Sequence, residues 1–279
     1  MQNISLKTGW KGFLSFTFVN QKSKTVVKDK QHFGPLVLQR PYYQELNRPT
    51  VLVIHPPGGI VGGDQLEVIV RFGLEAKGLV STPAATKFYR SQGQLAKQTQ
   101  TIHVNEFAEV EWLPQETLFF DHSNVDNRLI ICLDSPNNKL IAWDIVGLGR
   151  PARGEGFASG VLTQSLEFWI ENELVFVDRL KLSQDSILLD SISGLNAHVL
   201  YASALFYCED STVQSDLLEK LQAMSSPVNF GVTKIKKLIV LRALATELDE
   251  LKTLLFEAWK IARPDILKVP VVKPRIWNT

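Results

Sequence analysis

Short apolar stretches with a period of two residues recur from the start of the chain to about Ser193. Alternation of this kind is typical of a β-strand with one buried face and differs from the 3.6-residue period of a helix. β-branched and aromatic residues are frequent in these stretches, and turn-forming residues separate them. We therefore expect a mainly β fold of many short strands, the clearest of which are residues 12–20, 50–57, 65–73, 100–104, 108–113, 127–134, 139–147 and 161–182. Within the last range, residues 171–173 separate two alternating arms and predict a hairpin turn.

Two segments near the C-terminus have a helical period instead. In residues 211–224 and 246–264, apolar side chains recur every three or four residues, which places them on one face of a helix. The second segment carries acids early and bases late, and we expect its helix to stop at Pro264. Residues 228–244, between the two segments, have the pattern of one strand. Pattern alone does not separate a β-barrel, a sandwich and a solenoid.

No boundary divides the chain. The sequence has no Gly/Ser-rich or Pro-rich linker, no low-complexity tract and no repeat. Its 279 residues, 45% of them hydrophobic, are enough to bury a large core. We therefore expect residues 1–279 to form a single domain.

The charge balance excludes several classes of partner. With 30 basic and 29 acidic residues, a formal net charge of +1, the chain has no sustained field for nucleic acid or an anionic membrane. It has neither an apolar run of the roughly 18 residues that a membrane span needs nor a secretory signal pattern in residues 1–16. Sparse cysteines, Cys132 and Cys208, are typical of a reducing compartment. We expect a cytoplasmic protein whose partners are proteins or small ions.

The glycine-rich residues 55–64 resemble a nucleotide-binding loop only in part. Gly58 and Gly63 have the spacing of the two glycines in the P-loop motif G-x-x-x-x-G-K-[ST]. Asp64 and Gln65 stand where that motif needs a lysine for the phosphates and a hydroxyl for magnesium. The residues that follow alternate like a strand, whereas a P-loop opens a helix. We therefore exclude nucleotide binding at this loop.

The sequence shows no motif for catalysis or for a preassembled metal site. Its five histidines form no H-x-H, H-E-x-x-H or Cys/His pair, and it contains no G-x-S-x-G motif. Glu116 and Asp121 could supply a glycosidase-type carboxylate pair, although acids on alternating strands usually form a solvated face. These patterns do not favour an enzyme over a binding protein.

Three loops carry more turn-forming and polar residues than packing requires: residues 55–64, 82–91 and 149–160. The first and third combine tight-turn glycines with an acid, Asp64 or Glu155. Each acid has two interpretations, a structural corner in which the carboxylate caps free amides or a functional group. The residues alone leave both open.

These three loops, together with residues 34–43, 111–121 and 274–279, closely resemble the urease accessory proteins of the UreD family, called UreH in some organisms. The resemblance runs from end to end, and the motifs keep the same order along the chain. Residues 122–123 differ from those of many relatives, and residues 209–226 carry no motif that matches. These departures affect the expected partner preference more than the expected function.

The resemblance implies a role that composition and spacing do not show. UreD-family proteins are not enzymes, and they act with UreF and the GTPase UreG to deliver nickel to apo-urease. The resemblance implies a protein that sits directly on urease and offers a polar route for the ion. It also implies a solenoid-like (β-helical) stack of strands with helices near the C-terminus. We expect no tightly bound cofactor, and nickel only as transient cargo.

Three acids are candidates for this nickel path: Asp64, Asp144 and Glu155. Each lies beside a turn or small-residue motif, where a carboxylate can face a polar interior, and carboxylates bind such an ion loosely enough to release it. For Asp144, which lies in an alternating strand, solvent exposure is the alternative. For Glu155, the alternative is an ion pair with Arg150 or Arg153.

Two other functions remain as alternatives. One is a stand-alone β-solenoid hydrolase that uses paired carboxylates such as Glu116 and Asp121. The other is a structural adaptor that never touches metal.

Overall fold

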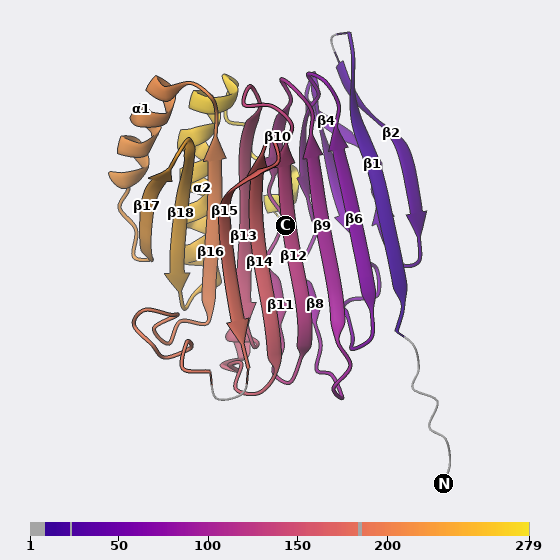
Figure 1. Ribbon diagram of the computed structural model, residues 1–279, viewed down its shortest axis with the longest axis vertical. Helices are drawn as coiled ribbons and strands as arrows, with labels where there is room; N and C mark the ends of the chain where they lie inside the picture. The colour runs from indigo at the N-terminus through magenta and orange to yellow at the C-terminus, as the bar shows by residue number, and fades with distance from the viewer. Residues whose placement is uncertain (1–8, 23, 184–185, 279) are drawn as a thin grey trace.

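The computed structural model of the chain describes residues 9–22, 24–183 and 186–278 (Figure 1). These residues form eighteen strands, two α-helices and two short 3-10 helices, Pro151–Arg153 and Arg275–Asn278. Both α-helices lie near the C-terminus: α1 (Ser211–Gln222) and α2 (Leu248–Leu267). The predicted mainly β fold with two C-terminal helices is therefore confirmed.

All the described strands belong to two open sheets. In spatial order, the seven-stranded sheet contains β15 (Glu173–Leu182), β14 (Val161–Ile170), β12 (Asn124–Leu133), β9 (Ala96–Val104), β6 (Gln65–Phe72), β1 (Lys11–Gln21) and β2 (Lys24–Phe33). The main path of the eleven-stranded sheet contains β17 (Asn229–Ile235), β18 (Leu238–Ala245), β16 (Leu200–Tyr207), β13 (Lys139–Leu148), β10 (Glu109–Trp112), β7 (Lys77–Ser81), β5 (Arg48–Ile54) and β3 (Val37–Leu38). Beside this path lie β4 (Tyr42–Glu45), β8 (Thr86–Phe88) and β11 (Thr117–Phe119).

The chain crosses repeatedly from one sheet to the other. It runs from β5 to β6, β7, β9, β10, β12, β13 and β14, and each step in this series changes sheet. Within each sheet, these successive strands run in the same direction and pair in parallel. Antiparallel partners, β2 and β15 in one sheet and β16, β18 and β17 in the other, complete the edges.

Strand β13 shows how the sequence builds two cores. Its residues Leu140, Ala142 and Val146 point into the core between the sheets, whereas Ile141 and Trp143 point into a second core beneath the helices. Because both faces of β13 are covered, the strand is apolar almost throughout, as expected for a buried parallel strand. The inward position between Ala142 and Val146 belongs to a charged residue, which the next section describes.

The helices form a third layer on the eleven-stranded sheet. Figure 1 shows α2 (yellow) behind β16 and β18, on the side away from the seven-stranded sheet. Asp210 caps α1 by accepting hydrogen bonds from the amides of Thr212 and Val213, an arrangement that typically contributes about 1 kcal/mol. Within the described residues, no helix is long and apolar enough to cross a membrane.

Two details of the predicted C-terminal part are wrong. Residues 228–244 do not form one strand, because a turn at Lys236, with φ of 52°, folds them into the β17–β18 hairpin. Helix α2 does not stop at Pro264 but continues to Leu267, and it ends where Lys268 adopts the left-handed conformation. The proline removes one helical hydrogen bond, and burial of the helix against the sheet offsets that loss.

Candidate functional site

Asp64 fastens the glycine-rich loop to the start of the chain. Its side chain is buried, and its Oδ1 and Oδ2 accept hydrogen bonds from the amides of Trp10 (2.7 Å) and Val61 (2.9 Å). The chains approach closely here, because a Cβ on Gly9 would lie 2.0 Å from the carbonyl carbon of Gly63. Both carboxylate oxygens of Asp64 therefore have structural partners.

Glu155 lies at the surface and pairs with Arg150. The Nε atom of Arg150 donates to Glu155 Oε2 at 2.6 Å, a second guanidinium nitrogen donates to Oε1, and the two backbones are bridged as well. The ion pair is accessible to solvent, so it contributes at most about 1 kcal/mol. This partner is one of the two that the sequence offered as alternatives to the nickel path.

Asp144 occupies the inward position of β13 in the core between the sheets. Burial raises the pKa of its carboxyl to about 6; the hydrogen bond from Gln164 opposes this rise, and the nearby Asp178 carboxylate adds to it. The Nε2 atom of Gln164 donates to Asp144 Oδ2 at 2.5 Å. Within the part of the chain that the structure describes, Oδ1 has no hydrogen-bond donor. Asp144 is thus a half-buried carboxylate with one hydrogen-bond donor among the described side chains.

Asp144 is one member of a row of polar side chains between the sheets. On the seven-stranded sheet, Gln98, Asn127 and Gln164 lie side by side on β9, β12 and β14. Gln98 donates to Asn127 Oδ1 at 3.1 Å, and Asn127 donates to Gln164 Oε1 at 2.7 Å. Because Gln164 then donates to Asp144, the row crosses from one sheet to the other.

A second row lies opposite, on the eleven-stranded sheet. Asp144, Ser203 and Arg242 occupy paired positions on β13, β16 and β18. Asp178 of β15 connects this row with the first sheet, because its Oδ2 accepts from Ser203 (2.5 Å) and its Oδ1 from Arg242 (2.9 Å). We refer to Gln98, Asn127, Gln164, Asp144, Ser203 and Asp178 as the interior polar network.

The interior polar network reaches the surface beside β15, β17 and β18. A cavity of about 480 Å³ lies there, with Asp178, Tyr201 and Arg242 in its lining. Burial raises the pKa of Tyr201 well above 10; the carboxylates of Asp144 and Asp178 raise it further, and Arg242 lowers it. The Tyr201 hydroxyl therefore lies in the field of both acids.

The three acids predicted for a nickel path do not meet. Asp64 accepts hydrogen bonds from two backbone amides, and Glu155 pairs with Arg150 at the surface. Of the three acids, Asp144 is the one that belongs to the interior polar network. Across residues 9–22, 24–183 and 186–278, no group of three or more His, Cys, Asp or Glu side chains is placed to hold a metal ion. The network instead offers separate oxygen atoms of carboxylates, amides and a hydroxyl along one line.

Comparison with known proteins identifies the family. The family model described as "UreD urease accessory protein" matches residues 11–278. The chain is 35% identical to the urease accessory protein UreD of Alcanivorax borkumensis, over 92% of this chain and 86% of the relative. It is 34% identical to that of Klebsiella aerogenes, over 98% of each chain. The chain belongs to the UreD family.

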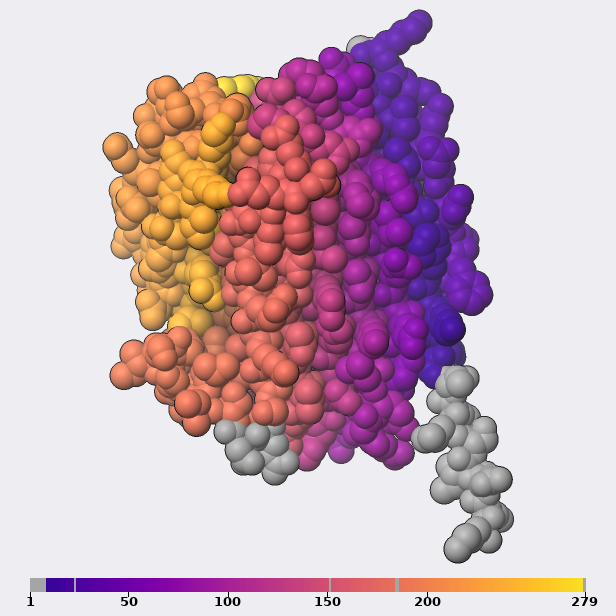
Figure 2. Space-filling view, in the orientation of Figure 1, coloured from indigo at the N-terminus to yellow at the C-terminus, as the bar shows by residue number. Residues whose placement is uncertain are grey.

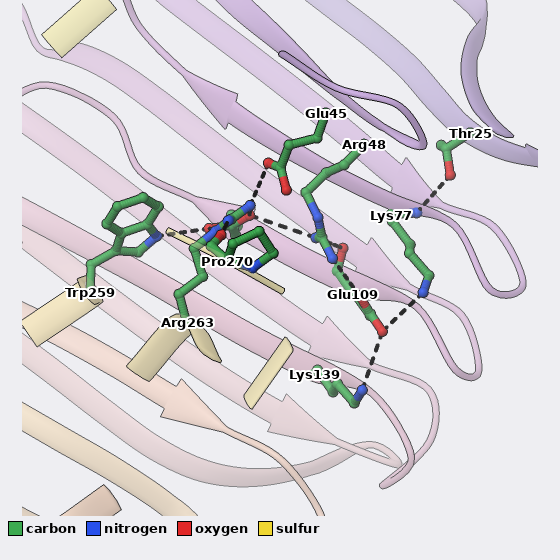
Figure 3. Close-up of polar contacts among 10 residues, drawn as sticks. Thr25, Glu45, Arg48, Lys77, Glu109, Lys139, Trp259, Arg263 and Pro270 are labelled. Carbon is green, nitrogen blue, oxygen red and sulfur yellow. Dashed lines mark hydrogen bonds and ion pairs between the residues drawn. The ribbon is translucent and has the colours of Figure 1, made fainter. Parts of the chain in front are cut away.

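A second polar cluster in this UreD-family protein fastens α2 to the eleven-stranded sheet (Figure 3). Glu111 is fully buried and accepts from Trp259 Nε1 (2.7 Å) and from Arg263 Nε (3.0 Å). Arg263 also pairs with Glu45 and donates to the Pro270 carbonyl, so it connects α2 with the N-terminal and C-terminal segments. The charges are matched, which gives this cluster a structural role.

The same cluster continues to the surface through Glu109. Burial tends to raise the pKa of this carboxyl, but Arg48, Lys139 and Lys77 together hold it below its usual range. The two lysines each lie 3.2 Å from Glu109 Oε1, and Arg48 pairs with Oε2. Glu109 is therefore a fully compensated carboxylate, in contrast to Asp144.

The acids of the hydrolase alternative are engaged in similar ways. Glu116 pairs with Lys252 of α2 at 2.6 Å. Asp121 accepts from the amides of Ala158 (3.0 Å) and Ser159 (2.6 Å), which holds the 149–160 loop in place. Neither carboxylate is brought to the other as a catalytic pair, and we find no observation that favours this alternative.

Sequence analysis missed every member of the interior polar network except Asp144. A signal was present in β14, where Leu162, Leu166 and Phe168 face the core between the sheets. Gln164 takes the remaining position in this otherwise apolar series. Gln98 on β9 and Asn127 on β12 are likewise polar residues at inward positions of alternating strands. Such residues are the feature that could have indicated the network.

Proposed function

We propose that this UreD-family protein is a non-catalytic scaffold that binds apo-urease together with UreF and UreG and helps to deliver nickel to the urease active site. In this proposal the protein acts in the cytoplasm, where urease is assembled, and holds nickel only in transit. Membership of the family supports the role in urease maturation. The interior polar network supports an internal route for the ion.

The observation that carries this proposal is Asp144, a half-buried carboxylate with a raised pKa and one hydrogen-bond donor among the described side chains. In a partly buried position, a charge without a full set of partners destabilises the fold unless water, a proton or a cation compensates it. Gln164, Asn127 and Gln98 extend from Asp144 toward the middle of the seven-stranded sheet, and Asp178 extends toward its edge. Oxygen ligands of this kind suit an ion that must be released.

We also propose that the winding of the chain is solenoid-like. One strand in each sheet per turn, with parallel pairing between turns, gives a long interior enclosed by two sheets. An interior of this shape can hold a continuous line of polar side chains, since neighbouring turns place equivalent positions in contact.

Substitution of the candidate acids tests this function. We expect D144N to lower urease activation while capture of UreF and apo-urease is unchanged. D64N and E155Q test the remaining two predicted acids. If D144N and D178N both support activation at the wild-type level, with complexes intact, nickel takes another route.

A further inference from the structure

The outer end of the interior polar network is closed by an ion pair between the two sheets. Arg242 comes from β18 of the eleven-stranded sheet and Asp178 from β15, the edge strand of the other sheet. Their nitrogen and oxygen atoms lie 2.9 Å apart. Asp178 lines the cavity at this edge, and its carboxylate is close enough to Asp144 to raise the pKa of that residue.

The two partners differ in exposure. The Arg242 side chain is 62% exposed, whereas that of Asp178 is 12% exposed. Ser203 holds the inner oxygen of Asp178, Oδ2, so Arg242 covers the oxygen that remains. The guanidinium therefore takes the position in which a cation would first meet the carboxylate.

The ion pair between Arg242 and Asp178 can break at little energetic cost. Within the described part of the chain, Asp178 is its single hydrogen-bond and ion-pair partner. Gly231 is its neighbour on β17, and a Cβ there would meet nothing within 4 Å; both residues line the cavity. An ion pair with one exposed partner is weak and is readily exchanged.

The surrounding loop leaves this edge accessible. Ser193, Gly194 and Leu195 belong to the segment between β15 and β16 and line the same cavity. In the space-filling view this segment (orange-red) projects at the lower left, below β17 and β18 (Figure 2). The cavity thus opens between the loop and the strand ends.

We propose that Arg242 gates the interior polar network by competing with a divalent cation for the carboxylate of Asp178. This inference rests on the proposed nickel route and specifies how its outer end is controlled. An arriving cation displaces the guanidinium, which swings to solvent, and the arginine returns once the ion has moved inward. Arg242 is then a positioning residue for transfer and not a ligand of the ion.

The test compares Arg242 with a matched arginine of the same cavity. Arg179 also lines it and is 60% exposed, but its partner is Glu167, not Asp178. R242Q and R179Q remove the same charge from the same region. Each variant is expressed with the urease subunits and the other accessory proteins, and urease activity is measured over a series of nickel concentrations.

We expect R242Q to lower the nickel concentration for half-maximal activation by about two- to fivefold, the effect of removing one weak competing ion pair. R179Q should match wild type, and R242K, which keeps the charge, should restore the wild-type requirement. An unchanged or higher nickel requirement in R242Q, with complexes intact, overturns the gate.

Urease activation by D144N distinguishes an error in the proposed gate from an error in the proposed nickel route. If D144N impairs activation while R242Q and R179Q behave alike, the route stands and the gate is wrong. If D144N and D178N activate urease normally, the route itself is wrong and the gate is lost with it.

Discussion

Replacing Asp144 by asparagine should make the protein more stable at pH 8 while it lowers urease activation. The difference between an ordinary aspartate pKa of 3.8 and about 6 in the folded chain corresponds to a destabilisation of about 3 kcal/mol when the group is ionised. D144N removes this charge but weakens the hydrogen bond from Gln164, which loses about 1 kcal/mol. We therefore expect a net gain of about 2 kcal/mol, or roughly 3 °C in Tm for a chain of this length.

The pH dependence follows from the direction of this pKa shift. Between about pH 4 and pH 6 the folded protein keeps a proton on Asp144 that the unfolded chain releases, so wild-type stability falls as the pH rises through this range. Above about pH 6, ionised Asp144 destabilises the wild-type protein by the full amount. The advantage of D144N should therefore be largest at pH 8 and should disappear near pH 4.

Urea denaturation followed by tryptophan fluorescence at pH 8 and pH 4.5 measures both effects. D126N is the control, because Asp126, on β12 of the seven-stranded sheet, forms a solvent-accessible pair with Arg128, and its loss should change stability by less than about 1 kcal/mol. If D144N is no more stable than wild type at pH 8, or if its advantage is the same at both pH values, Asp144 is not a destabilised carboxylate.

Four further predictions concern structural contacts. D64A should lose about 2–4 kcal/mol in a urea titration, because two amides of the glycine loop lose their acceptor. E155Q should change the same midpoint by less than about 1 kcal/mol, since its ion pair with Arg150 is at the surface. R263M should lose about 3–5 kcal/mol, because the buried Glu111 keeps its charge without its main partner. Deletion from Pro270 onward should reduce capture of UreF in a pull-down; a folded product with unchanged capture contradicts a docking role for this tail.

The sequence predicted strands well where one face of the strand is covered. β6 alternates between buried and more exposed positions, and β14 does so except at Ser165, which is buried; both strands were located from their pattern. β16 has both faces buried and therefore no alternation, and no predicted strand covered it. The β17–β18 hairpin was merged into one strand because its turn at Lys236 carries neither glycine nor proline, the usual signals of a tight turn.

The site was less accessible to sequence reasoning, because it depends on which residues face each other. Alternation could not decide whether Asp144 is exposed, since β13 is covered on both sides. Asp178 lies opposite Leu166 in the β14–β15 pair, and its contact with Ser203 comes from the other sheet. Such contacts depend on how two sheets are stacked, which local periodicity does not specify. For Asp64, composition offered amide capping as one of two interpretations, and the geometry shows both oxygens engaged in that way.

A purely structural role and a role in ion transfer predict different effects of a neutral side chain at position 144. Substitution of Asp144 therefore distinguishes the two roles. If the network served only to hold the sheets together, a neutral side chain at position 144 would accept the hydrogen bond from Gln164 and remove a charge at no functional cost. A compensated cluster exists in the same molecule: the Glu109 carboxylate is surrounded by three basic groups and its pKa is lowered. The fold can therefore neutralise a buried acid with arginine and lysine, yet beside Asp144 it places an amide and a second acid. In the function that we propose, a mobile cation is the partner that Asp144 lacks, and a structural charge pair at this position would exclude that cation.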